Sequence, residues 1–473
     1  MKFKIFTVLA FCASAVAFAQ TQYKYGNKFD FDPEQEKDVK LVAGDNNSYY
    51  LQSSTNENSI RSNNTIYIRK FDNSNNLKET FSHEMPQMEK YAPINYLGSF
   101  ESGNKIVFIT ETYAGKLKKK DIYKVIFDKS TSAFTDELLV SYPIESTMKS
   151  GTTYFEKSEN GRYGAVVFYN HSPRKEPEKI DINVIDSGSL KSAWSKQVTA
   201  EAGSSDTDFF VTNSGNVGLL RSVSQNAMLL FVTPSGQEEK FFTEKMKVIS
   251  ETVVSMGSQD YLLAFNSTPK AVKFNASDFE NLMLYDIQEG KIISNNVIKD
   301  YNDGTKIADV YIPYTYLSGD KIYLFTESKI DSGTRKVKSP MGTMTFDETF
   351  YRAGDPRMVV LNTTGTIESV TKLEYQKRPA SPDIHSFGII NVKGNYIVKN
   401  GGAFGMNLID LENPGMKILN SLPPNTSKDP YYEAGDAYGQ GVLYRADTKT
   451  LLIPRTFNGN QASIIAIENF EGK

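Results

Sequence analysis

Short apolar stretches that alternate with polar residues recur along the whole chain, separated by tight turns. The stretch KSENGRYGAVVF, residues 157–168, shows the arrangement, with Asn160 and Gly161 between two alternating runs. An Asn-Gly pair favours the turn that joins adjacent antiparallel strands, and period-two alternation is typical of strands. This stretch therefore predicts a β-hairpin, and a third strand that ends in a polar turn follows it.

The same order of strand, turn, strand and third strand occurs eight times. The units begin at Val39, Ile94, Thr152, Asp208, Glu251, Tyr314, Phe387 and Gly441. Their mean spacing of about 55 residues is close to the period of four-stranded propeller blades with long loops. The pattern predicts an all-β fold, a β-propeller of about eight four-stranded blades, with seven blades and one irregular unit as the alternative. A pair of β-sandwiches also has short strands but does not require this order.

The two ends of the chain predict how the ring closes. The last unit ends at Lys473, directly after its third strand. The segment YKYGNKFDFD, residues 23–32, precedes the first unit and has the composition of a strand. We expect this N-terminal strand to pair with the last unit, because that pairing removes an exposed sheet edge.

An apolar leader precedes this segment. Lys2 and Lys4 come before an apolar run over residues 5–18, and Ala17 and Ala19 form an A-x-A site. These features predict a signal peptide over residues 1–19 and a single propeller domain over residues 20–473. The protein is thus expected to be exported, to the periplasm or outside the cell. Cys12 is the only cysteine and lies in the leader, so we expect no disulfide in the mature chain.

The charge of the chain argues against nucleic acid as a partner, and its apolar stretches argue against a transmembrane segment. The chain has 53 Lys and Arg against 56 Asp and Glu, a formal net charge of -3. Nucleic-acid binding needs a concentrated basic footprint, so nucleic acid is not an expected partner. No stretch after the leader has the roughly 18 consecutive apolar residues of a spanning helix, so no transmembrane segment is expected.

One hairpin resembles a known family. The stretch SENGRYGAVVF, residues 158–168, is similar to the S-P-D-G-x-x-x-A-F hairpin of TolB-like propeller blades, with Glu159 in place of Pro and Asn160 in place of Asp. The resemblance implies the blade architecture of secreted β-propeller repeat proteins. It implies no activity, because propellers include binding proteins, lyases, hydrolases and scaffolds.

The connections between the second and third strands predict which face of the ring carries the function. They leave the same face as the connections between blades, and they hold nearly all the long insertions. Long loops in a compact domain are usually functional or disordered. The longest, residues 327–356, is expected to form a lid or a hairpin, with a disordered flap as the alternative. The basic run KLKKK, residues 116–120, predicts a solvated surface.

Catalytic signatures are scarce. The sequence contains no G-x-S-x-G, H-E-x-x-H or P-loop motif. Its three histidines, His83, His171 and His385, are predicted to lie on the loop-rich face, with His83 and His385 in blade-to-blade connections near the central channel.

The loop DYNDGTKIAD is the nearest approach to a metal site. Asp300, Asn302 and Asp303 could offer oxygens to calcium, although the glycine comes one position too early for an EF-hand. An ordinary Asx turn is the alternative, and no other cofactor is expected.

One aromatic and acidic cluster indicates a binding site. Tyr431, Tyr432, Asp436 and Tyr438 lie in a predicted blade-to-blade connection on the loop-rich face. Tyrosine rings beside carboxylates suit a carbohydrate or peptide ligand, and tyrosines packed at a blade interface are the alternative. The sequence therefore favours a non-catalytic module that binds a ligand or a partner protein. A hydrolase or lyase that acts on glycan or peptide at the channel mouth is one alternative, and a structural part of an envelope assembly is another.

Overall fold

The computed structural model describes residues 22–32, 35–45, 47–55, 64–89, 92–146, 148–170, 176–202, 205–223, 226–242, 245–267, 281–298, 307–338, 345–373, 378–379, 387–389, 396–400, 406–410, 434–437, 441–457 and 460–468. The secondary-structure elements in this part of the chain are all β-strands.

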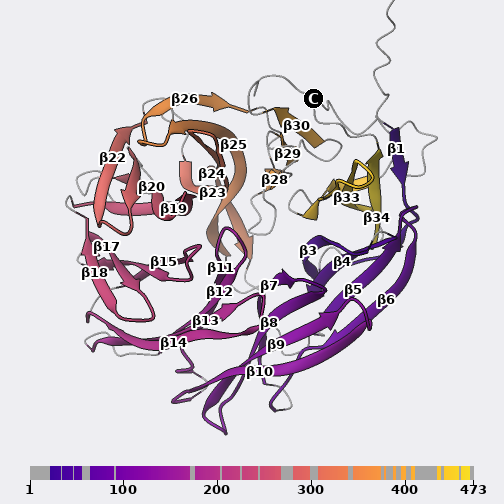
Figure 1. Ribbon diagram of the computed structural model, residues 1–473, viewed down its shortest axis with the longest axis horizontal. Coiled ribbons are helices and arrows are strands. Elements are labelled where there is room, and N and C mark those ends of the chain that lie inside the picture. Colours follow the sequence, from indigo (N-terminus) through magenta and orange to yellow (C-terminus); the bar gives the residue numbers. More distant parts are fainter. Residues whose placement is uncertain are drawn as a thin grey trace, which may run out of the picture.

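These strands form eight antiparallel sheets around a central axis (Figure 1). We call each sheet a blade and number the blades along the chain. In the four-stranded blades the first strand lies nearest the axis and the fourth lies at the rim (Figure 1). The arrangement confirms the predicted all-β propeller, and the sheets in the described residues agree with eight blades.

The first four blades are complete. Blade 1 contains β3 (Glu36–Ala43), β4 (Ser48–Thr55), β5 (Thr65–Asp72) and β6 (Leu77–Glu84). Blade 2 contains β7 (Ile94–Ser102), β8 (Lys105–Ala114), β9 (Lys119–Asp128) and β10 (Ala133–Pro143). Blade 3 contains β11 (Thr152–Lys157), β12 (Tyr163–Tyr169), β13 (Glu178–Asp186) and β14 (Lys191–Ala200). Blade 4 contains β15 (Ser205–Val211), β16 (Val217–Val223), β17 (Asn226–Val232) and β18 (Gln237–Phe241).

Blade 5 is also a regular four-stranded sheet, whereas blades 6 to 8 have five, three and six strands. Blade 5 contains β19 (Lys247–Met256), β20 (Gln259–Ser267), β21 (Asn281–Asp286) and β22 (Lys291–Val297). Blade 6 contains β23 (Ile307–Ser318), β24 (Lys321–Lys338), β25 (Thr345–Asn362), β26 (Ile367–Lys372) and β27 (Arg378–Pro379). Blade 7 contains β28 (Phe387–Ile389), β29 (Tyr396–Asn400) and β30 (Met406–Asp410). Blade 8 contains β31 (Ala434–Ala437), β32 (Leu443–Arg445), β33 (Thr450–Phe457), β34 (Gln461–Glu468), β1 (Gln22–Tyr25) and β2 (Phe29–Asp30).

The Asn-Gly hairpin joins β11 and β12 of blade 3. Gly161 has a φ of 66°, which glycine adopts without steric cost, and its amide donates to the carbonyl of Ser158 over 2.9 Å. The turn also reaches other blades. The Asn160 amide donates to Oδ1 of Asn213 in blade 4 over 2.9 Å, and the Ser255 amide of blade 5 donates to Oε2 of Glu159 over 3.2 Å.

The two ends of the chain close the ring as predicted. β1 pairs with β34 from Gln22 opposite Glu468 to Tyr25 opposite Ile465, and β2 pairs with β34 at Phe29 opposite Ala462. The N-terminal segment therefore supplies the outer strand of blade 8. This pairing covers the edge of β34 that would otherwise be open to other chains.

A buried arginine secures the closure. Arg69 in β5 donates to both carboxylate oxygens of Glu36 in β3, over 2.7 and 2.8 Å, and each of these side chains is 6% exposed. The guanidinium also lies 5.6 Å from the ring centroids of Phe29 and Phe31 in the N-terminal segment. Cation-π contacts therefore hold this segment against blade 1, and the bidentate pair with Glu36, which lies within blade 1, fixes the position of the guanidinium that makes them.

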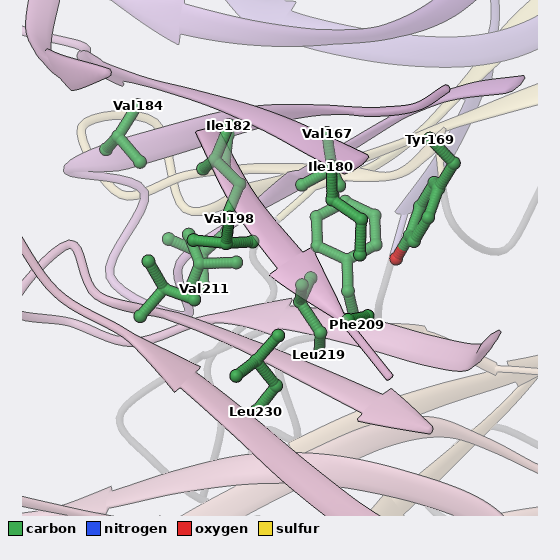
Figure 2. Close-up of a cluster of buried hydrophobic side chains, with 14 of the residues drawn as sticks. Val167, Tyr169, Ile180, Ile182, Val184, Val198, Phe209, Val211, Leu219 and Leu230 are labelled. Carbon is green, nitrogen blue, oxygen red and sulfur yellow. The ribbon is translucent and has the colours of Figure 1, made fainter. Parts of the chain in front are cut away.

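The hydrophobic core lies between neighbouring blades. In one cluster, Ile180 and Ile182 of blade 3 face Leu219 and Leu230 of blade 4 (Figure 2). Comparable clusters join blades 1 and 2, 2 and 3, 4 and 5, 5 and 6, and 8 and 1. From blade 8 through blade 1 to blade 6, each of these junctions thus buries the apolar faces of the two blades that meet there, as in other repeat proteins.

A polar contact repeats at successive blade junctions. A side chain on the third or fourth strand of one blade donates to a carbonyl in the turn between the third and fourth strands of the next blade. These contacts are Lys124 Nζ to Leu190 O (2.6 Å), Lys196 Nζ to Thr233 O (3.2 Å), Lys240 Nζ to Ile287 O (2.8 Å) and Asn296 Nδ2 to Gly365 O (2.6 Å). These hydrogen bonds satisfy backbone carbonyls in the turns and fix the orientation of adjacent blades.

Two predicted insertions are largely strand. The basic run from residue 116 lies partly in β9, and Lys120 is 1% exposed and paired with Glu111 at 3.0 Å. The expectation of a solvated run is wrong for Lys120, because this residue belongs to β9 and its ammonium donates to the hydroxyl of Thr153 in blade 3 over 3.2 Å.

In the longest insertion, β24 and β25 pair as far as Lys338 opposite Thr345, which confirms a hairpin.

Replacing Arg69 should weaken the closure strongly. The variant Arg69→Ala leaves Glu36 as an unpaired buried charge, and we expect the free energy of unfolding to fall by about 3 to 5 kcal/mol in urea titrations. The control Lys149→Ala breaks the exposed Lys149–Glu145 pair, whose side chains are 51% and 61% exposed, and should change stability by less than about 0.5 kcal/mol. Equal losses in the two variants would contradict this account.

Candidate functional site

Charged side chains from different blades gather on the strands nearest the axis. They form two groups on β3, β11, β15 and β19, which are the first strands of blades 1, 3, 4 and 5. We call Glu156, Asp208 and Glu251 the acidic group, and Lys40 and Lys157 the lysine pair. Shifted pKa values, such as those of the acidic group and of Lys157, gather at functional sites, which makes this the candidate site.

The acidic group spans three successive blades. Burial, and after it the charge of Asp208, raises the pKa of Glu251 well above its usual range, and Glu251 donates a hydrogen bond to Asp208. Burial also raises the pKa of Asp208. Oε1 of Glu251 is shielded from solvent and has no hydrogen-bond partner among the described residues. The raised pKa values favour the protonated carboxyl, which can both donate and accept hydrogen bonds.

Glu156 extends the acidic group onto β11. On this strand Phe155 is buried, whereas Tyr154 and Glu156 on its other face are exposed. Although Glu156 contacts solvent, the surrounding protein removes much of the water around its carboxyl. This burial, followed by the charge of Asp208, raises the pKa of Glu156 to about 7.

The lysine pair comes from two blades that are not adjacent. Lys40 belongs to β3 of blade 1 and Lys157 to β11 of blade 3. Lys157 lies within the electrostatic influence of Lys40. Lys157 keeps more than a third of its surface exposed, yet burial lowers its pKa to about 8, with the nearby charge of Lys40 as the second cause. The pair therefore carries less than its full charge at mildly alkaline pH.

Asp38 lies beside the lysine pair in a strained conformation. Its φ is 50°, which is uncommon for residues other than glycine, and the β3–β4 register shifts at this point. Oδ2 of Asp38 accepts hydrogen bonds from Ser99 Oγ and Gln52 Nε2, each over 2.9 Å, and from the Tyr96 hydroxyl. Strain held by several partners is common at functional sites.

The structure places His83 elsewhere than predicted. His83 lies in β6, the rim strand of blade 1, and not in a connection near the axis. Its Nε2 lies 2.8 Å from Oδ1 of Asp136, and its ring stacks on Phe134 at 4.9 Å, both on the rim strand of blade 2. The predicted placement is wrong because β6 stays paired with β5 as far as Glu84 opposite Thr65.

The other predicted site residues lie almost entirely outside the described residues, so their grouping stays a prediction. Asp436 belongs to β31, of which only the backbone is described. Outside the described residues lie Tyr431, Tyr432, Tyr438, His171, His385, Asp300, Asn302 and Asp303.

Sequence reasoning missed both groups at the axis. The available signal was an acidic residue in the first strand of three successive units, Glu156, Asp208 and Glu251. Nothing in the sequence places Lys40 next to Lys157, because they are far apart along the chain and their contact depends on the curvature of the ring.

Two further observations concern only the described part of the chain. No group of three or more His, Cys, Asp or Glu side chains there is arranged to hold a metal ion. No helix there has the length and apolar character needed to cross a membrane.

Glu156 should make stability depend on pH in a direction set by its raised pKa. Ionisation of its carboxyl is less favourable in the folded chain than in the unfolded chain, so the free energy of unfolding falls as the pH rises from 4.5 to about 7. The variant Glu156→Gln cannot ionise and should lose this contribution. The Tm of the variant minus that of the wild type, measured by calorimetry, should therefore increase across this range.

A matched control is Glu239→Gln, at an exposed position on the rim strand β18. Its Tm difference from the wild type should stay constant over the same range. A constant difference for Glu156→Gln would show that the ring does not disfavour the Glu156 carboxylate.

Comparison with known proteins adds only structural similarity. No family model matches the chain, and no curated protein does. The Dos1 propeller is 13% identical with a TM-score of 0.46, over 95% of this chain and 96% of that chain. Sqt1 of Chaetomium thermophilum, bound to the N-terminus of ribosomal protein L10, is 10% identical with a TM-score of 0.43, over 93% and 98%. The propeller domain of the Trilobed protease from Pyrococcus furiosus is 12% identical with a TM-score of 0.37, over 85% and 99%. Similarities at this level support no argument about function.

Proposed function

We propose that the protein is an exported, non-catalytic propeller that binds an extended segment of a partner protein on its loop-rich face. The observation that carries the proposal is the extension of blade 6. β24 and β25 each have 18 residues, whereas the first and fourth strands beside them, β23 and β26, have 12 and 6.

The extension is a two-stranded projection, which we call the arm, made of residues 331–338 and 345–351. β23 pairs with β24 only as far as Ile330, and β26 pairs with β25 from Arg357 onward. Beyond these points the two strands pair with each other, and β27 adds only two pairs, at Arg352 and Ala353. At about 3.3 Å per residue, the arm reaches about 25 Å.

The arm suits recognition by strand addition. Within the described residues, no strand other than β25 pairs with residues 331–338 of β24. A free strand edge can accept an extended segment through main-chain hydrogen bonds. The register places Arg335 opposite Glu348 and Lys336 opposite Asp347, so the arm carries both signs of charge and the favoured partner is an extended segment with strand-forming residues.

Other parts of the proposal rest on the sequence. Export follows from the predicted signal peptide, with the periplasm or the exterior as the destination. The TolB-like character of residues 158–168, calcium at Asp303 and its neighbours, and carbohydrate binding at Tyr432 and its neighbours stay predictions.

Shortening the arm should abolish peptide binding. Peptides selected on the purified protein from a displayed random library should be rich in strand-forming residues such as Val, Ile, Thr and Tyr and should bind one per chain. In the variant, residues 332–350 are replaced by an Asn-Gly turn, which joins antiparallel strands. Its Kd for these peptides, measured by calorimetry, should be at least about tenfold weaker.

The control replaces residues 115–118, the turn between β8 and β9 on the same face, with Asn-Gly and should bind as the wild type does. Mass spectrometry of the peptides after incubation distinguishes binding from hydrolysis. Cleaved peptides would favour the enzyme alternative, and unchanged binding by the shortened variant would contradict the role of the arm.

A further inference from the structure

The turn between β11 and β12 reaches farther across the ring than a contact between neighbouring blades. Its Asn160 amide donates to Oδ1 of Asn213 in blade 4 over 2.9 Å. Its Glu159 carboxylate accepts through Oε2 from the Ser255 amide of blade 5 over 3.2 Å. The inner strands contact one another in sequence, β11 with β15 and β15 with β19. The bond from Glu159 to Ser255 therefore passes across the inner strand of blade 4.

A third blade lies within the electrostatic influence of the turn. Tyr314 belongs to β23, the inner strand of blade 6, and its pKa is raised by burial, then by Tyr316 and by the charge of Glu159. β11 and β12 lie close to the middle of the ring (Figure 1). A turn that is bonded to blades 4 and 5 and also influences blade 6 lies over the middle of the ring. It does so on the plain face, which we define as the face opposite the loop-rich face.

The turn is held in this position from both sides. Toward blade 5, Nδ2 of Asn213 donates to Oγ of Ser255 over 2.6 Å, and this hydroxyl donates to Oδ1 of the buried Asp260 over 2.5 Å. Toward blade 3, the hydroxyl of Ser187 donates to the carbonyl of Gly161 over 2.8 Å. Several hydrogen bonds in one network stabilise a single conformation of the turn.

We infer that the β11–β12 turn closes the ring axis on the plain face, so that a ligand reaches the inner strands only from the loop-rich face. The inference does not depend on the arm. A partner segment that enters the axis must end or turn back there, because the turn blocks its passage through the ring. The axis therefore suits the end of a chain or the tip of a loop, and it excludes a threaded chain.

The access of a thiol reagent to β11 tests the closure. A chain that begins at Gln20 contains no cysteine, because the only one is Cys12, so a single introduced thiol can be followed. Thr152 and Glu156 are both exposed on β11, Thr152 at the end toward the loop-rich face and Glu156 next to the turn. A maleimide carried on a polyethylene glycol chain should label Thr152→Cys at least about tenfold faster than Glu156→Cys.

Releasing the turn should remove this difference. The double variant Glu159→Ala/Asn213→Ala deletes the side chains that bind the turn to blades 4 and 5 and leaves the Asn-Gly pair unchanged. In this background the labelling of Glu156→Cys should become about tenfold faster, because the turn opens more often, and that of Thr152→Cys should stay the same. Glu159→Ala alone keeps the bond to Asn213 and should give a smaller increase.

Two controls accompany the release variants. Glu239→Ala removes an exposed carboxylate on the rim strand β18 and should leave the labelling at both positions unchanged. Trp194, the only tryptophan, donates through Nε1 to the carbonyl of Gly215 over 3.0 Å, in the same blade 4 turn as Asn213. Its fluorescence, followed during thermal unfolding, should show that each variant is folded.

Three results would overturn the inference. They are equal labelling of Thr152→Cys and Glu156→Cys with the turn intact, no acceleration at Glu156→Cys in either folded release variant, and equal acceleration at both positions. The chain with the shortened arm should give the same labelling pattern as the intact chain. Failure of the arm to bind peptides and failure of this closure are therefore distinguishable.

Discussion

The pairing of β1 and β2 with β34 is the interaction on which the rest of the ring depends. A blade buries its apolar faces only against its neighbours, so an open ring would leave blades 1 and 8 each with an exposed face. The cluster at this junction includes Phe29, Phe31, Leu452 and Ile464, and burial of each such side chain contributes about 1.5 to 3 kcal/mol. Arg69 adds to this apolar contact, because its guanidinium is held by Glu36 within blade 1 and lies against the rings of Phe29 and Phe31.

Closure of the ring also sets the environment of the axis. Apolar clusters and lysine-to-carbonyl contacts repeat between successive blades and hold their first strands in a fixed relation. Charged residues on these first strands therefore influence one another although they come from different blades. The carboxyls of Glu156 and Asp208 hold their protons more strongly, and Lys157 holds its proton less strongly, for the same reason. Burial removes water and so disfavours the charged form of a carboxyl and of an amine alike. The nearby like charges, Asp208 for Glu156 and Lys40 for Lys157, disfavour the charged form further.

The arm and the axis present different chemical groups. The arm has a strand edge that pairs with no other strand among the described residues, which is why we propose it for an extended partner segment. The first strands at the axis instead carry charged side chains, those of the acidic group and of the lysine pair.

The sequence by itself determined the all-β class, the repeated hairpin order and the closing role of residues 23–32, because alternation and turn residues act over a few positions. It did not determine that Lys120 is buried or that His83 lies on a rim strand, because these outcomes depend on where β9 and β6 end. Only the tertiary structure brought Lys40 to Lys157 and Asp208 to Glu251. Contacts between blades arise from the curvature of the whole ring, and no local pattern in the chain encodes that curvature.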